Sequence, residues 1–294
     1  MTLQGKHRRC AFLTFLLASS SCTSLTDVAV TYRPCFPVKG RDYVEKFEIT
    51  EQELLEGCWK IDGVAKETAI FTREGDLIVR PPPGLRWSPR ERGPAAFRQM
   101  RGDFLVVTRA EATSTFRGDH CLRHGESAGL VVTRAAPFGW ATLLVSPYFG
   151  SETPIAVSCV DEPTKAPSAR VVAKSFAFGP ASGPAELEQR KEGVGADGEA
   201  YIALCRQGDQ LAYYYRAQVP KPGDSGWFQV RDPHPISRDP LDVGVTTTSG
   251  DPSDASGATG MEGHFPWIAY YDYSDAPVAD GCEGALTSFV APEE

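Results

Sequence analysis

The chain has 294 residues, of which 41% are hydrophobic, and it carries 38 acidic against 30 basic side chains, a formal net charge of −8. An acidic surface repels phosphate backbones, and no basic stripe with interleaved aromatic residues offsets this charge, so we expect no nucleic-acid partner. The acidity otherwise indicates only good solubility.

The first 21 residues predict a signal peptide. Basic residues from Lys6 to Arg9 precede the apolar run Ala11–Ala18, which is too short to span a bilayer, and three serines then supply the small residues of a cleavage site. Cleavage leaves 27 Lys and Arg against 38 Asp and Glu, a net charge of −11. We therefore expect an exported protein.

Cys22 follows the expected cleavage site, where bacterial lipoproteins carry an acylated cysteine. The stretch resembles a lipobox but departs from it, because Ser19 stands where a leucine is usual. We predict that Cys22 is lipidated, that residues 22–41 form a tether, and that the mature protein is a lipoprotein of the bacterial cell envelope, with membrane contact through the lipid anchor only. The alternative is a secreted or periplasmic protein without an anchor.

Six further cysteines remain in the mature chain, an even number that predicts three disulfides in an oxidising compartment. They are Cys35, Cys58, Cys121, Cys159, Cys205 and Cys282. Their spacings match no zinc motif, and of the possible pairings we favour Cys35 with Cys58 because that bond would close a short local loop.

Most of the chain reads as short strands that are rich in β-branched and aromatic residues and bounded by Gly, Pro and Asp. We predict strands at 70–72, 76–80, 104–109, 129–134, 140–146, 155–159, 170–178, 201–205, 211–216, 227–230, 241–245, 265–273 and 285–290. Short connections at 73–76, 135–139 and 207–209 predict hairpins. Only 183–193 reads as a helix, short and polar, with proline in its first turn and glycine at its end.

Strand after strand without intervening helices predicts an antiparallel all-β architecture. We expect one β-sandwich domain over residues 42–294, with one short surface helix.

The order of several motifs resembles the concanavalin-A-like lectin/glucanase superfamily, and within it the regulation-of-enolase-like branch. The motifs are 97–110, 126–134, Trp140, 201–209, 213–216, 226–230, 243–245 and Phe265, and the resemblance covers residues 55 to 275. It implies a two-sheet antiparallel jelly-roll sandwich whose concave face often binds glycans. The branch has no settled activity, so the resemblance implies no reaction.

The sequence supports neither of two catalytic motifs considered for this fold. The Glu-x-Asp-x-x-Glu pattern of glycosidases in this superfamily is missing, although paired carboxylates are what glycoside hydrolysis requires. Gly125–Gly129 matches the G-x-S-x-G elbow of esterases, but a strand begins immediately after Ser127, where an elbow needs a helix. We predict instead that Ser127 enters the strand beside a glycine that allows two backbones to approach closely. We assign no catalytic residue.

Metal ligation is also disfavoured, and we expect no metal site and no cofactor. His120 and His124 would share a face only on a helix, yet their segment reads as a loop. Structural calcium could bind four loop aspartates, but solvated acids are the favoured interpretation. These aspartates are Asp239, Asp242, Asp251 and Asp254.

The aromatic residues are the remaining candidates. In a strand over 211–216, Tyr213 and Tyr215 share one face, and Tyr214 and Arg216 share the other. One set must be core, and the other, with Trp227 nearby, would offer a flat apolar surface with polar handles for sugar rings. We predict a binding site at Tyr214, Arg216 and Trp227.

Two functions follow from these observations. We favour a non-catalytic binding module at the cell envelope that recognises a glycan or a protein partner. The alternative is an extracellular hydrolase of polysaccharide or ester.

Overall fold

The computed structural model describes residues 43–47, 59–62, 69–82, 87, 93–114, 126–134, 139–148, 168–176, 187–194, 199–223, 225–238, 240–249, 261–273 and 280–292. The predicted signal peptide, the tether with Cys22, and the predicted strand at 155–159 lie outside these residues. No helix in the described ranges is long and apolar enough to span a membrane.

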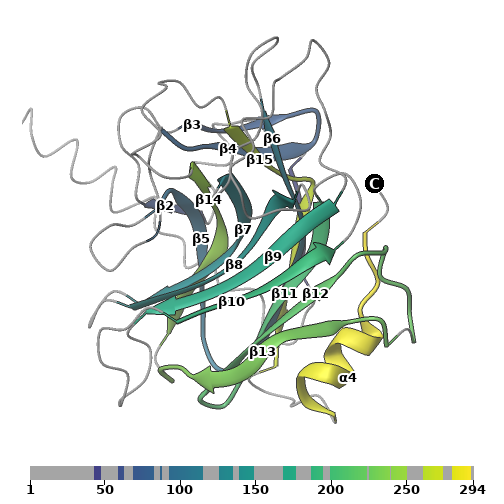
Figure 1. Cartoon of the computed structure of the whole chain (residues 1–294). Coiled ribbons are helices and arrows are strands. Elements are labelled where there is room, and N and C mark those ends of the chain that lie inside the picture. The colour runs from purple at the N-terminus through teal and green to yellow at the C-terminus, as the bar shows by residue number, and fades with distance from the viewer. Residues whose placement is uncertain are drawn as a thin grey trace, which may run out of the picture.

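The described strands form two antiparallel sheets (Figure 1). The nine-stranded sheet has the order β13-β12-β11-β6-β15-β4-β3, with β16 beside β6 and β1 beside β16. Its strands are β1 (Tyr43–Lys46), β3 (Ala69–Arg73), β4 (Asp76–Arg80), β6 (Phe104–Ser114), β11 (Glu199–Gln207), β12 (Gln210–Arg216), β13 (Phe228–Pro235), β15 (Met261–Phe265) and β16 (Trp267–Asp272).

The seven-stranded sheet has the order β10-β9-β8-β7-β14-β5-β2. Its strands are β2 (Lys60–Asp62), β5 (Ala95–Met100), β7 (Glu126–Arg134), β8 (Gly139–Tyr148), β9 (Ser168–Phe176), β10 (Leu187–Val194) and β14 (Leu241–Ser249). One helix among the described residues, α4 (Gly281–Ser288), lies against β11 near the C-terminus (Figure 1).

The main core lies between the two sheets, because alternate residues of each strand point inward. Leu130 and Val132 of β7 belong to the same buried cluster as Ile202 and Leu204 of β11. A second buried cluster covers the outer face of the nine-stranded sheet, where α4 packs. The predicted all-β architecture, two antiparallel sheets packed as a sandwich, is confirmed.

Turn chemistry sets the register of two predicted hairpins. Glu74 and Gly75 both have positive φ (54° and 88°), as a two-residue turn between twisted strands requires, and Arg73 pairs with Asp76. Gly208, with φ of 61°, makes the β11–β12 turn, where Gln207 pairs with Gln210. β7 and β8 pair as predicted, although residues 135–138 lie outside the described ranges.

The helix predicted at 183–193 is wrong. Residues Leu187–Val194 form β10, the edge strand of the seven-stranded sheet, paired with β9 through Arg190 and Val172 and bulged between Lys191 and Val194. Its charged side chains favour a helix locally, but they equally suit an exposed sheet edge, where charge blocks pairing with other chains. Pairing with β9 makes this segment a strand.

The strand predicted at 285–290 is also wrong, because α4 occupies Gly281–Ser288. Cys282, Ala285, Leu286 and Phe289 are all buried, and their spacing of three and four residues places them on one helical face. That face packs on the nine-stranded sheet, so the short helix that the structure describes lies at Gly281–Ser288.

Cys205 and Cys282 form a disulfide that ties α4 to β11 across 77 residues of sequence. These two cysteines were expected to be disulfide-bonded, and they are. Cys35, Cys58, Cys121 and Cys159 lie outside the described residues, so the predicted Cys35–Cys58 pair stays a prediction.

Candidate functional site

The three predicted ligand-binding residues lie on or beside the outer face of the nine-stranded sheet, but that face is covered. Tyr214 and Arg216 are only 6% and 4% exposed, and Trp227 is half-buried against the same cluster as α4. The Arg216 Nε donates to the carbonyl of Gln218 (2.8 Å). We expected one aromatic set to stay open, whereas Tyr213 on the opposite face of β12 is buried as well.

Tyr213 belongs to the main core. Its hydroxyl lies 3.1 Å from Nδ1 of His234, and the guanidinium of Arg231 lies over its ring at 5.5 Å from the ring centroid. Burial, together with the positive charge of Arg231, lowers the pKa of His234 to about 4. Neutral histidine and tyrosine therefore support the core structurally at this end of the sandwich.

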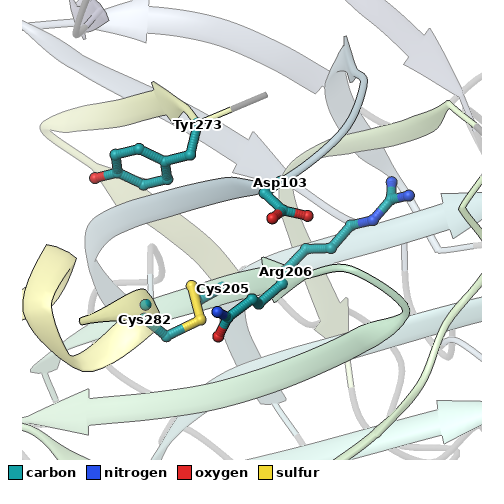
Figure 2. Close-up of a pocket in the computed structure, with 7 residues that line it drawn as sticks. Asp103, Cys205, Arg206, Tyr273 and Cys282 are labelled. Carbon is teal, nitrogen blue, oxygen red and sulfur yellow. A yellow bond between two sulfur atoms is a disulfide. The ribbon is translucent and has the colours of Figure 1, made fainter. Parts of the chain in front are cut away.

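A small pocket opens at the rim of the face that α4 covers (Figure 2). Its lining comes from four places in the chain: Asp103 just before β6, the end of β11 from Cys205 to Gln207, Tyr273 just after β16, and the first residues of α4, Gly281 and Cys282. In Figure 2 the Tyr273 ring stands on one side, the Asp103 carboxylate points inward, and the disulfide lies beneath.

Backbone hydrogen bonds hold the pocket together around Asp103. The Gly208 N–H donates to the Asp103 carboxylate (2.6 Å), and the Tyr273 N–H donates to the Asp103 carbonyl (3.0 Å). The Arg206 Nε donates to the Gly208 carbonyl (3.2 Å), which fixes the same turn from the other side. One residue thus positions both the aromatic wall and the β11–β12 turn.

The pocket combines the groups that sugar recognition uses. Tyr273 is half-buried and stacks on Tyr271, with ring planes 9° apart. This stacking fixes the orientation of the Tyr273 ring. Asp103 supplies carboxylate acceptors, and the exposed Gln207 supplies an amide donor and acceptor. A flat apolar surface beside a few convergent polar groups is typical of small-ligand sites. The residues of this site are far apart in the chain, so no sequence motif indicates it.

The structure also contains a buried charged cluster around Glu262 that the sequence did not indicate. Glu262 of β15 is 1% exposed, yet it accepts hydrogen bonds from Arg73 (2.6 Å) and from Nε of Arg80 (3.1 Å). His264 lies between two carboxylates, with Nδ1 3.3 Å from Asp76 and Nε2 3.5 Å from Glu262.

The arginines keep Glu262 ionised. Burial alone would raise the pKa of Glu262, but the hydrogen bonds and charges of Arg80 and Arg73 together hold that pKa below its ordinary value. The general acid of a glycosidase needs the opposite shift, because it must donate a proton near neutral pH. Glu262 is therefore suited to an ion pair and not to acid catalysis.

Ser127 of the G-x-S-x-G match lies inside β7, as predicted. It is 5% exposed, and its hydroxyl shares a hydrogen bond with that of Thr248 on the neighbouring β14 (2.7 Å). Gly129 permits the predicted close approach, since a Cβ there would lie 2.1 Å from the carbonyl oxygen of Leu143. This match therefore marks sheet packing.

The residues considered for metal binding are mostly outside the described ranges: His120, His124, Asp239, Asp251 and Asp254. Asp242 is described, and it forms an ion pair with Lys60 (2.7 Å). Within the described part of the chain, no group of three or more His, Cys, Asp or Glu side chains is arranged to hold a metal ion.

Comparison with known proteins identifies no family. No protein-family model matches the chain, and no curated protein does. Among solved structures, xylan β-1,4-xylosidase from Bacillus halodurans C-125 is similar, with a TM-score of 0.52 and 14% identity over 82% of this chain and 41% of the xylosidase. The GH43 protein BlXynB from Bacillus licheniformis gives 0.51 and 13%, over 81% and 40%. A functionally unknown protein from Saccharomyces cerevisiae gives 0.49 and 12%, over 72% and 95%.

At these identities the similarity is one of fold. The chain spans about two fifths of the length of the two bacterial proteins, and it shares their β-sandwich architecture over four fifths of its own length. Folds carry unrelated functions, so the activity has to be argued from the site.

Proposed function

We propose that this protein is a non-catalytic carbohydrate-binding module of the regulation-of-enolase-like branch, exported and held at the cell envelope by lipidated Cys22. The observation that carries the binding function is a pocket whose lining includes Tyr273, Asp103 and Gln207. A sugar ring would stack on Tyr273 while its hydroxyls exchange hydrogen bonds with the two polar side chains.

The charge of the protein favours a neutral glycan. After the proposed cleavage the sequence carries a net charge of −11. This charge would repel an anionic polysaccharide. We therefore propose a neutral oligosaccharide of pyranose units as the ligand.

The competing function is an extracellular hydrolase. A retaining or inverting glycosidase needs a carboxyl held protonated beside a second carboxylate. Glu262, the most buried acid of the described charged cluster, has its pKa lowered by Arg80 and Arg73 despite its burial. This environment supports the binding function over hydrolysis.

A glycan array with the purified protein, followed by titration calorimetry on the strongest neutral hit, tests the proposal. Tyr273→Ala should weaken binding about ten-fold, which corresponds to about 1.4 kcal/mol for the lost stacking surface. Gln207→Ala should weaken it less, because one exposed amide is lost. Phe228→Ala is the matched control, since Phe228 is 59% exposed on β13 and does not line the pocket, so it should leave affinity unchanged.

Three results would reject this function. Equal affinity in the Tyr273→Ala and Phe228→Ala variants would place the site elsewhere. Silence on every glycan would favour a protein partner. Release of reducing sugar during the titration would favour the hydrolase.

A further inference from the structure

The pocket adjoins a group of aromatic side chains that surround Phe289. Tyr271, on which Tyr273 stacks, also contacts Phe289, with ring centroids 5.9 Å apart and planes at 86°. Phe289 also contacts Trp267 (5.8 Å) and Trp227 (6.3 Å). We call Trp227, Trp267 and Tyr271 the aromatic cage. Phe289, only 2% exposed, occupies it.

The cage contains two donors that Phe289 cannot satisfy. The indole N–H groups of Trp227 and Trp267 are buried, and neither has a hydrogen-bond partner among the residues that the structure describes. Trp267 is 1% exposed, so bulk water does not reach it. An unsatisfied buried donor is costly, and a phenyl ring has no oxygen or nitrogen atom to accept a hydrogen bond from these N–H groups.

We propose that the aromatic cage is a second subsite for a pyranose ring, and that Phe289 occupies it when no glycan is bound. This inference rests on the proposed function. A pyranose has apolar C–H faces that stack on aromatic rings, as Phe289 does, and it also carries oxygens that accept hydrogen bonds from indole N–H groups. Because Tyr271 and Tyr273 stack directly, the cage and the pocket would hold neighbouring units of one chain.

The C-terminal segment is built so that Phe289 can leave while α4 stays. Phe289 is the first residue after the helix and has extended backbone angles (φ −70°, ψ 133°). The disulfide of Cys282 holds the other end of α4, and the Gly223 N–H donates to the carbonyl of Thr287 (2.9 Å) near its end. Val290, the next residue, is 51% exposed. Rotation of the backbone at Phe289 would open the cage with the loss of one hydrogen bond to α4, from the Phe289 N–H to the Leu286 carbonyl (3.2 Å).

The test compares Phe289→Ala with Leu286→Ala in the full-length protein. Leu286 is equally buried, at 2% exposed, and packs in the same cluster from within α4, so its loss loosens the packing while Phe289 stays in place. Xylohexaose and cellohexaose are the probes, measured by calorimetry. Phe289→Ala should bind the hexasaccharide about ten-fold more tightly than the parent protein, because no side chain has to be displaced. Leu286→Ala should change affinity little.

A second readout does not depend on the variants folding. The chain has five tryptophans, and each gives one indole signal in a ¹H–¹⁵N spectrum. Saturation of the parent protein with the hexasaccharide should shift the signals of Trp227 and Trp267 and leave that of Trp140 in place. Trp140 is the control because it is fully buried on the other sheet.

Each outcome is decisive. Binding that Tyr273→Ala weakens, with equal affinity in Phe289→Ala and no shift of Trp227 or Trp267, would overturn the second subsite and leave the proposed function standing. Failure of both oligosaccharides to bind any of these proteins, together with silence of the parent protein on the glycan array, would overturn both. Equal tightening by Leu286→Ala would reject the displacement of Phe289 as the cause.

Discussion

Two glycines show how single residues set the spacing of the seven-stranded sheet. A Cβ at Gly129 would lie 2.1 Å from the carbonyl oxygen of Leu143 and 2.8 Å from the Cα of Leu144. A Cβ at Gly244 would lie 1.8 Å from the carbonyl oxygen of Ala96. Both clashes are with neighbouring strands, whose backbones cannot move without breaking the pairing of β7 with β8 or of β14 with β5.

Gly129→Ala should therefore lower the free energy of unfolding by about 3 kcal/mol, as severe overpacking does. Urea denaturation of the parent and variant proteins measures it. A loss under about 0.5 kcal/mol, the range of ordinary surface substitutions, would show that β7 and β8 are not as close as described.

His234 gives the protein a pH dependence that can be measured. Burial lowers its pKa to about 4 in the folded state, whereas an unfolded chain titrates near 6.5. The folded state binds the proton more weakly, so the contribution of His234 is complete above about pH 6.5 and is lost as the pH falls towards 4.

The loss should amount to about 2 kcal/mol between pH 7 and pH 4, allowing for the partial exposure of the ring. Urea unfolding at both pH values measures it for the parent protein and for His234→Gln. The variant should lose less stability on acidification. An identical loss in both proteins would assign the pH dependence to other groups.

At the scale of elements, the sequence predicts the interior of the sandwich better than its ends. The strand at 76–80 was predicted with its observed bounds, and the strand at 211–216 differs from β12 by one residue, because β-branched and aromatic runs between turn residues carry their own signal. The segment that forms strand β10 was predicted to be a helix, and the segment that forms helix α4 was predicted to be a strand. Short polar and small-residue segments have weak local preferences, and partners distant in the chain decide them.

A signal for α4 was nevertheless present. The apolar residues of this segment repeat at helical spacing, at Cys282, Ala285, Leu286 and Phe289. The strand was predicted from residues 285–290 alone, without Cys282, which begins the helical pattern. The α4 helix should depend on its disulfide, which closes a long loop between β11 and the C-terminus.

Replacement of both Cys205 and Cys282 by alanine should lower the free energy of unfolding by about 4 kcal/mol, since the 77-residue separation leaves the unfolded chain much freer. Urea denaturation of the parent and variant proteins measures it. An unchanged midpoint would mean that the packing of α4, and not the bond, holds this end of the molecule.

At the scale of the whole molecule, the sandwich could be predicted from sequence and the candidate site could not. The pocket joins Asp103, the end of β11, Tyr273 and α4, which only the fold brings together. The ion pair of Arg73 with Glu262 spans 189 residues. Tyr214 and Trp227 of the predicted binding site belong to the cluster on the outer face of the nine-stranded sheet, and the sequence pattern did not reveal that α4 covers this face.

The proposed lipid anchor at Cys22 is tested by Cys22→Ser. We expect the parent protein in the membrane fraction of a bacterial host and the variant in the soluble exported fraction, because acyl chains bury many methylene groups in the bilayer. Fractionation followed by mass spectrometry of the N-terminal peptide measures both location and acylation. Equal distribution of the two proteins would favour simple secretion.

The most direct measurement is a crystal structure of the protein with the neutral oligosaccharide that binds it most tightly. We expect one pyranose ring stacked on Tyr273, with hydroxyls within hydrogen-bonding distance of Asp103 and Gln207, and an intact glycosidic chain. A sugar bound away from this pocket, or a cleaved product within it, would contradict the account.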